Sequence, residues 1–561
     1  MTRTHKTRAT PRTGGSDRPP DDNLGSLLES VTDVVAQVEP GRVVLVQGDR
    51  TRTWLQLDER ADRLAAHLRS AGVVPGARVG IALFNSVEYV ETLLAVFKLR
   101  AVPVNVNYRY QETELEEVAA YTGLTGLVFD ASLLTSMRNV RPRVPSLRSL
   151  VCVDEGDGND VVAYSDAMSA PRHERQRRTG QDQIIVLTGG TTGRPKGVVW
   201  EHAGVRAVVS SAYGRRGLPV PADLAGIVET ARHQVETGAA PVMLPVSPLM
   251  HGTGFFLTLG NLLLGGRVVL MCNRSFDAAE VLSAIQTHGV QEMAIVGDAF
   301  ARPLLAEMRL ASQRGAPYDI STLERVVSAG VRWSPEVQRE MLRQGRMVLQ
   351  DSIASTEGGP YGLSTVGPGD QPVSGRFTLP PNARVVTADG TDVVPGSGEV
   401  GVLASTGALP LGYFEDPKAT AEVFRTIDGV RYAVPGDAAT VESDGTLTLL
   451  GRGNSVVNTG GEKVFVEEVE EALLGHPEVD DAVVVGVPSE RWGSRVTALV
   501  CVAPGTHPTS EELSEHVGRI LAGYKRPREV FLVDAIRRTA SGKTDRRWAA
   551  GTARDLSAGE G

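Results

Sequence analysis

Cysteine is scarce in this chain, with three residues among 561. Cys152, Cys272 and Cys501 each lie inside or beside an apolar run, which is typical of small buried side chains, and their spacing matches no metal site. The sequence therefore argues against a disulfide-stabilised fold or a cysteine-bound metal. We expect a protein of a reducing compartment, with all three cysteines buried.

Long apolar runs and an excess of positive charge are also missing. No run approaches the ~18 apolar residues that a membrane-spanning helix needs. Residues 1–24 are polar and lack the apolar stretch of a secretory signal, so they predict a disordered tail. The net charge of -9 argues against a nucleic-acid-binding protein. These absences favour a soluble, cytoplasmic protein whose partner is a small molecule.

What the sequence does contain is a repeated order of apolar strands and amphipathic helices. A chain of 561 residues exceeds what one hydrophobic core usually organises, so two or more domains are expected. Helix and strand patterns alternate from about residue 25, which predicts layered α/β structure with largely parallel sheets. The clearest examples of this pattern lie at 42–49, 57–72, 77–85, 278–297 and 334–352.

The pattern changes after about residue 375 and again near residue 463. Short strands broken by Asp-Gly and Pro-Gly turns predict a small β-rich region first. A further unit of helices and strands then follows, about a hundred residues long. We therefore predict an α/β fold with a large N-terminal domain, residues 25–453, that includes this β-region. A smaller mobile C-terminal α+β domain is expected over residues 454–561.

The stretch LTGGTTGRPKGVVW, residues 187–200, has the composition of an anion-binding loop. Glycines let the backbone approach a ligand, and consecutive N–H groups can form an anion nest. Threonine hydroxyls and Lys196 add donors and positive charge. The spacing is not that of a Walker A loop or a dinucleotide fingerprint. Taken alone, the loop is either a polyphosphate clamp or a solvated turn.

Five further motifs follow in a fixed order and make the chain resemble the adenylate-forming superfamily, which includes acyl-CoA synthetases, nonribosomal adenylation domains and luciferases. The resemblance spans roughly residues 25–549 and is strongest to bacterial fatty-acyl and steroid side-chain CoA synthetases. The motifs are STEGG at 355–359, GEVGVLASTGALPLGYFEDPKATAEVF at 398–424, YAVPGD at 432–437, GRGNSVVNTGGEKVFVEEVE at 451–470 and RRTASGKTDR at 537–546.

The resemblance implies that a carboxylate attacks the α-phosphorus of ATP and displaces pyrophosphate. Glu357 would bind Mg²⁺, which prefers oxygen ligands. Asp437 and Arg452 would contact the ribose, and Lys543 would offset charge in the transition state. His251 would stand at the mouth of the acyl pocket, whose wall could include the apolar stretch 252–266. The other implied nucleotide-binding residues are Thr188, Gly189, Gly190, Thr191, Thr192, Gly193, Lys196, Gly330, Ser355 and Thr356.

Three positions depart from the family pattern. Ile353 and Ala354 stand where the family commonly has an aromatic residue that stacks on adenine, so aliphatic contact with adenine is expected. Asn454 stands at the hinge, where it can still adopt unusual backbone angles. Arg537 replaces a common proline. None of these changes removes a charged catalytic group.

The resemblance also implies a second half-reaction, in which the small domain rotates and the loop with Gly460 and Gly461 lies along the CoA tunnel. No carrier domain follows Lys543, so we expect a separate acceptor, and CoA is the leading candidate. The alternatives are a carrier protein, amide formation, or activation of nitrite for diazotisation of an aminoaryl acid. A non-catalytic nucleotide-binding relative is a further alternative, against which the retained charged residues argue. A homodimer is possible.

Overall fold

The computed structural model describes residues 22–154, 156, 160–188, 195–330, 333–373, 375–452, 456–459, 462–489, 493–521, 523–539 and 543–559. Residues 22–24, which we expected in the polar tail, belong to the fold instead. Asn23 is fully buried, caps the first helix and donates to Asp182 over 2.9 Å. None of the helices in the described ranges is long and apolar enough to span a membrane.

One sheet is formed around the strands that flank the glycine-rich loop. Its order is β19-β9-β8-β4-β3-β5-β6-β7, parallel from β8 through β7 and antiparallel at β8–β9 and β9–β19. Its strands are β3 (Arg78–Ala82), β4 (Val102–Asn105), β5 (Leu124–Asp130), β6 (Ser149–Val153), β7 (Val162–Ala163), β8 (Gln183–Thr188), β9 (Lys196–Glu201) and β19 (Gly412–Tyr413).

A second, larger sheet is parallel from β1 through β14, with an antiparallel edge strand β2 beside β1, and it is antiparallel from β14 onward, where the β-rich region begins. The expectation of largely parallel sheets therefore holds for its first part only. Its strands are β1 (Val43–Gln47), β2 (Arg50–Thr53), β10 (Val242–Pro245), β11 (Arg267–Leu270), β12 (Glu292–Ile295), β13 (Arg325–Ala329), β14 (Val348–Ser355), β15 (Gly358–Val366), β16 (Arg376–Thr378), β17 (Ala383–Val386), β18 (Gly401–Ser405), β20 (Phe424–Ile427), β21 (Val430–Ala433), β22 (Asp437–Val441) and β23 (Thr446–Arg452).

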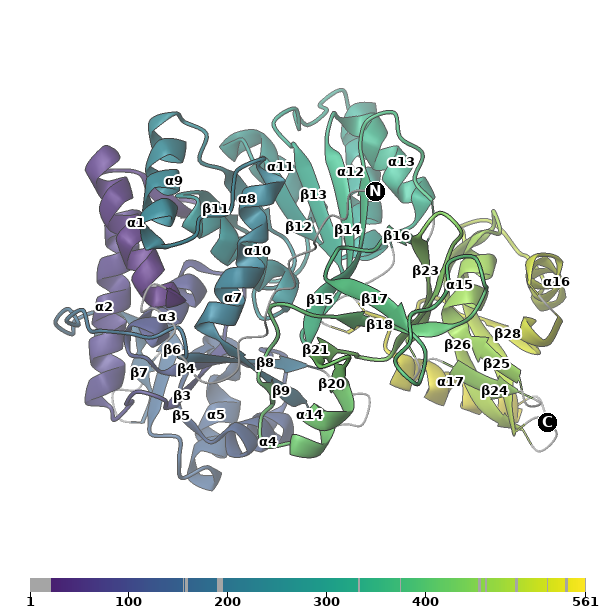
Figure 1. Ribbon diagram of the computed structural model, residues 1–561, viewed down its shortest axis with the longest axis horizontal. Helices are drawn as coiled ribbons and strands as arrows, with labels where there is room; N and C mark the ends of the chain where they lie inside the picture. The colour runs from purple at the N-terminus through teal and green to yellow at the C-terminus, as the bar shows by residue number, and fades with distance from the viewer. Residues whose placement is uncertain are drawn as a thin grey trace, which may run out of the picture.

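Helices cover both sheets and fill the space between them (Figure 1). The largest core joins helices α1, α2, α3, α7, α9 and α10 to strands of both sheets, whereas α4 and α5 cover the outer face of one sheet and α11–α13 that of the other. These helices are α1 (Leu24–Val38), α2 (Trp54–Ser70), α3 (Val87–Lys98), α4 (Glu112–Thr122), α5 (Leu134–Val140), α6 (Tyr164–Ala167), α7 (His202–Val209), α8 (Ser211–Arg215), α9 (Leu224–Glu236), α10 (Gly252–Leu263), α11 (Ala278–His288), α12 (Gly297–Gln313), α13 (Pro335–Gln344) and α14 (Pro417–Val423).

The C-terminal elements form a third sheet at one end of the molecule, beyond β23 (Figure 1). Helices α15 and α16 pack on one face and α17 on the other, and the sequence pattern had not indicated α17. The elements are β24 (Val456–Thr459), β25 (Glu462–Phe465), α15 (Val466–Leu474), β26 (Val479–Ser489), β27 (Gly493–Val502), α16 (Ser510–Ile520), β28 (Glu529–Leu532) and α17 (Arg546–Gly559).

The expectation for the cysteines holds for two of the three. Cys152 and Cys501 are buried in strands, whereas Cys272 is exposed. Cys272 follows β11, where the chain has already left the sheet, and its backbone N–H donates to Glu280. Its apolar neighbours in the sequence belong to the buried strand, and the cysteine itself does not.

Candidate functional site

The glycine-rich loop connects two strands of an antiparallel hairpin. Thr188 ends β8 and is paired with Lys196, the first residue of β9, so the two residues that flank the loop lie opposite each other. The Thr188 hydroxyl lies 3.4 Å from the backbone oxygen of Lys196. Gly189, Gly190, Thr191, Thr192 and Gly193 lie outside the described residues. The structure therefore fixes the two ends of the predicted phosphate clamp.

A segment from the 398–424 motif is paired with the strand that leaves this loop. Backbone N–H groups of Leu411 and Phe414 donate to Val199 and Gly197, each over 2.7 Å, and β19 extends the sheet next to β9. This pairing brings Tyr413 and Asp416 to Lys196. The Lys196 ammonium lies 5.1 Å from the centre of the Tyr413 ring and 3.9 Å from a carboxylate oxygen of Asp416.

Glu357 lies on the other side of Tyr413. The Tyr413 hydroxyl donates to Oε1 of Glu357 over 2.6 Å, and the Glu357 side chain is buried. The preceding residue, Thr356, accepts a 3.0 Å hydrogen bond from the indole of Trp200 in β9, and Ser355 contacts the hydroxyl of Tyr361. The predicted metal ligand and the predicted phosphate lysine thus converge on one tyrosine. The sequence analysis quoted the motif containing Tyr413 but gave it no role.

Asp437 and Arg452 are neighbours in the backbone ladder. Asp437 begins β22, Arg452 ends β23, and the two residues are directly opposite each other. The carboxylate expected at the ribose therefore stands at the strand end from which the chain passes to the C-terminal elements. The position of the Arg452 side chain lies outside what the structure describes, as do Asn454, Gly460 and Gly461.

Lys543 belongs to the C-terminal elements, and its side chain lies next to Gly330, the residue that follows a strand of the larger sheet. Gly330 follows β13 with a φ of 92°, and a Cβ built on it would lie 3.7 Å from Cε of Lys543. The backbone of Thr539 donates to the carbonyl of Lys543, and Arg538 is bridged to Thr544. This local pairing presents the lysine on a short turn beside Gly330.

His251 precedes α10 and lies near Lys543. Burial, with the nearby charges of Lys543 and Arg109, lowers the pKa of His251 to about 4. The imidazole is therefore neutral at physiological pH. Its Nε2 is buried without a protein partner among the described residues. A buried polar atom in this position is suited to contact a bound ligand.

A buried carboxylic acid lies in the strand next to the one that ends before Gly330. Asp351 of β14 is opposite Ser328 of β13, and burial raises its pKa to about 7. The backbone N–H of Ser352 opposes that rise, whereas the charge of Asp298 adds to it.

Ile353 does not lie where the sequence analysis placed it. Its side chain packs into the core of the β-rich region with Tyr361 and Phe377, and it is 9% exposed. The exposed side chain at this end of β14 is that of Ala354. The alternation of side chains along the strand sends Ile353 inward and leaves Ala354 exposed, and an aliphatic contact between Ala354 and adenine stays a prediction.

Comparisons with known proteins agree with this arrangement. Residues 32–414 match the AMP-binding enzyme family, and residues 468–543 match the AMP-binding enzyme C-terminal domain. The chain therefore belongs to the AMP-binding enzyme family of adenylate-forming enzymes. Within that family it is an AMP-forming acyl-CoA synthetase, an enzyme that uses ATP and CoA to activate a small-molecule acid.

Two relatives and one solved structure illustrate the similarity. The chain is 40% identical to a 3-oxocholest-4-en-26-oate–CoA ligase of Rhodococcus rhodochrous, over 94% of this chain and 95% of the relative. It is also 40% identical to a medium/long-chain-fatty-acid–CoA/3-oxocholest-4-en-26-oate–CoA ligase of Mycolicibacterium smegmatis, over 94% and 96% of the two chains. The anthranilate CoA ligase AuaEII in complex with anthranoyl-AMP has the same fold, with a TM-score of 0.79, 22% identity and coverage of 94% and 98%.

Proposed function

We propose that this acyl-CoA synthetase acts on a bulky apolar carboxylic acid of the fatty-acid or steroid side-chain type. The observations that support the proposal are the approach of Lys543 to Gly330 and His251, and the contacts of Tyr413 with both Glu357 and Lys196. The relatives that are 40% identical are named for such acids.

The first half-reaction forms an acyl-adenylate. A carboxylate oxygen attacks the α-phosphorus of ATP, the bond between that phosphorus and the bridging oxygen to the β-phosphate breaks, and pyrophosphate leaves. The loop after Thr188 and the Lys196 ammonium would hold the β- and γ-phosphates. Asp437 and Arg452 would hold the ribose at the adjoining strand ends. Each of these residues stands at the end of a strand, Thr188 opposite Lys196 and Asp437 opposite Arg452.

Glu357 is the residue we assign to Mg²⁺. Its carboxylate is a hard oxygen donor, and one of its oxygens is already held by Tyr413. This donor chemistry fits the ion. When bound, Mg²⁺ would neutralise part of the phosphate charge. Tyr413 would keep the carboxylate in one orientation, and Lys196 would supply a second positive charge on the other side of the same ring.

Lys543 is assigned to the adenylation step. Negative charge builds up on the α-phosphate oxygens during attack, and a fixed ammonium group stabilises that charge more than it stabilises the ground state. The neutral imidazole of His251 would contact the acyl group without adding charge. Helix α10, which follows His251, is apolar, and its Phe256 packs edge-to-face on the buried Trp200 of β9 at 6.0 Å, so we place the apolar acyl site along this helix. An apolar lining of this kind suits an apolar acid.

The second half-reaction would use the C-terminal elements in another orientation. The larger sheet ends at Arg452 and the C-terminal sheet begins at Val456. We therefore place the domain boundary and hinge at Asn454, between domains 25–453 and 454–561. Rotation there would withdraw Lys543 and admit the CoA thiol along the loop with Gly460 and Gly461.

The cytoplasmic location of the protein and its assembly as a homodimer stay predictions.

Pyrophosphate release and thioester formation, measured side by side, test the proposal. The panel contains acetate, benzoate, nitrite with an aminoaryl acid, medium- and long-chain fatty acids and a steroid side-chain acid, each with and without CoA. We expect pyrophosphate release with the apolar acids and thioester only after CoA is added. Turnover restricted to nitrite with the aminoaryl acid, or to small acids, would contradict the proposal.

A further inference from the structure

The last residue of β4 lies between the two halves of the site. Asn105 ends β4, which is a neighbour of β8, the strand that leads into the glycine-rich loop. The turn from β10 to His251 approaches the same point from the larger sheet. We propose that Asn105 is a positioning residue that fixes the phosphate-binding loop and the acyl-site histidine relative to each other. This inference rests on the proposed function.

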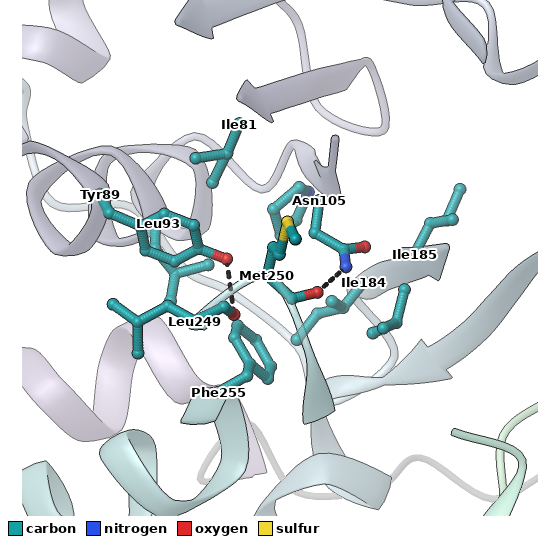
Figure 2. Close-up of a pocket in the computed structure, with 11 residues that line it drawn as sticks. Ile81, Tyr89, Leu93, Asn105, Ile184, Ile185, Leu249, Met250 and Phe255 are labelled. Atoms are coloured by element: carbon teal, nitrogen blue, oxygen red, sulfur yellow. Dashed lines mark hydrogen bonds between the residues drawn. The ribbon is translucent and has the colours of Figure 1, made fainter. Parts of the chain in front are cut away.

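The side-chain amide of Asn105 makes one hydrogen bond to each half. Its Oδ1 accepts from the backbone N–H of Leu187 over 2.7 Å, and Leu187 directly precedes Thr188. Its Nδ2 donates to the backbone carbonyl of Met250, which directly precedes His251 (Figure 2). Each hydrogen-bond partner is therefore the residue before Thr188 or His251, to which the proposed function assigns the phosphates and the acyl group.

The strand geometry explains why an amide is needed here. β4 and β8 are paired at Val104 and Ile185, and the ladder continues no further along the strands. The N–H of Leu187 therefore lacks a backbone partner from β4, and the Asn105 side chain takes that place. A buried N–H without a partner costs about 1–3 kcal/mol, so the contact specifies the position of the strand end.

The surroundings of this amide are apolar. Asn105 lines a small cavity of about 10 Å³ together with Ile81, Tyr89, Ile184, Leu249, Met250 and Phe255, which Figure 2 shows around it. A space of this size holds about one water at most. Water in this cavity is therefore a poor substitute for the half-buried amide, whose two hydrogen bonds are partly shielded from solvent.

A second asparagine holds the same turn but not the loop. Asn85 accepts from the N–H of Leu249 over 2.7 Å and donates to the carbonyls of Pro245 and Ser247 over 2.9 and 3.1 Å. Tyr89 also donates to the carbonyl of Leu249, over 2.9 Å (Figure 2). Asn85 thus anchors the His251 side alone, which makes it a matched comparison for Asn105.

Three variants separate the two contacts. Asn105→Ala removes both, and Asn105→Asp keeps the acceptor for Leu187 while replacing the donor to Met250 with a repelling oxygen. Asn85→Ala loosens only the turn. Asn382→Ala, which removes a side-chain hydrogen bond to Thr406 far along the chain, is the control for general effects on stability. The readouts are ATP affinity by calorimetry, kcat and KM for ATP and acid, and melting temperature.

We expect Asn105→Ala to weaken ATP binding and the kcat/KM for acid by about tenfold or more each. Asn105→Asp and Asn85→Ala should lower kcat/KM for acid but keep ATP affinity within about twofold of the wild type. The inference is overturned if Asn105→Ala affects ATP no more than Asn85→Ala, or if Asn105→Asp loses ATP affinity as Asn105→Ala does. Failure of the proposed function is a separate result, because the wild-type protein would then release no pyrophosphate with apolar acids.

Discussion

The hydroxyl of Tyr413 donates a 2.6 Å hydrogen bond to Glu357, and the ring of the same tyrosine lies 5.1 Å from the Lys196 ammonium. Residues from three separate motifs therefore meet at one side chain. The ring face stabilises the cation and the hydroxyl stabilises the carboxylate. In the proposed function, Tyr413 would therefore position both the residue assigned to phosphate and the residue assigned to Mg²⁺.

Tyr413→Phe is expected to weaken the response to Mg²⁺ and ATP. A hydrogen bond to a charged group contributes about 1.5–3 kcal/mol, so kcat/KM for ATP should fall about 10- to 100-fold. The Mg²⁺ concentration for half-maximal activity should rise, which a metal titration of pyrophosphate release measures. Tyr318→Phe removes a similar bond, to Glu307, outside the site and is the matched control. Equal metal titrations for the two variants would contradict the role of Tyr413.

Lys196→Met is expected to impair adenylation more than thioester formation. In the proposed first half-reaction the ammonium would face the leaving phosphates, whereas pyrophosphate is absent from the second. KM for ATP should rise by about tenfold or more, and thioester formation from pre-made acyl-adenylate should stay within about threefold. The control is Lys418→Met, which changes an exposed lysine on nearby α14. A similar loss in both half-reactions would argue against a phosphate role.

His251 makes the folded protein sensitive to acid. Its pKa is lowered to about 4 in the fold, whereas an unfolded histidine titrates near 6.5. Between these values the unfolded chain binds a proton that the folded chain does not, so stability falls as the pH falls from about 6.5 to 4. Above about pH 6.5 this loss of stability is absent, because neither the folded nor the unfolded chain then binds most of this proton.

Urea unfolding at pH 7.5 and pH 5 measures this effect. Replacing His251 by glutamine should reduce the loss of unfolding free energy between the two pH values by about 2 kcal/mol relative to the wild type. His507→Gln changes an exposed histidine and should leave the loss unchanged. An identical pH dependence in wild type and His251→Gln would refute the assignment of a neutral, buried imidazole.

Gly451→Ala is expected to disfavour the orientation that brings Lys543 to Gly330. Gly451 has a φ of 117°, and a Cβ there would overlap the carboxylate of Glu467 on α15, which Arg546 holds at 3.3 Å. We expect adenylation to fall about tenfold, with a smaller loss of thioester formation from pre-made acyl-adenylate. Gly445→Ala introduces a comparable φ strain, at 80°, in a turn with open space around it. The prediction fails if both glycine variants behave alike.

The sequence predicted the elements better than it predicted their contacts. Helical periodicity located α2 and α11, because each has one buried face and an N-cap residue, and short continuous apolar runs located β3 and β12, which are buried on both faces. The pairing of β19 with β9 joins residues more than 200 positions apart, and no local pattern encodes it. Tyr413 was therefore missed, although the motif around it was noticed.

Ile353 and Asn105 also show that the sequence predicted contacts less well than it predicted elements. Ile353 was placed by motif alignment, and strand alternation turned it into the core instead. Asn105 carried no signal, because a single asparagine after a strand is common and its importance depends on two backbone groups from distant segments. The charged motif residues could be proposed from motif spacing and order, and their roles stay predictions, whereas the residues that orient them depend on the packing of the layers.

The most direct test of the account is the exchange of labelled pyrophosphate into ATP by the wild type and by Lys543→Ala, with an apolar acid and without CoA. This exchange reports the reversible formation of acyl-adenylate alone. We predict robust, acid-dependent exchange for the wild type, a loss of at least about a hundredfold in Lys543→Ala, and much smaller impairment of thioester formation from pre-made acyl-adenylate. Exchange by Lys543→Ala at the wild-type rate would contradict the central claim that the lysine beside Gly330 and His251 supports adenylation.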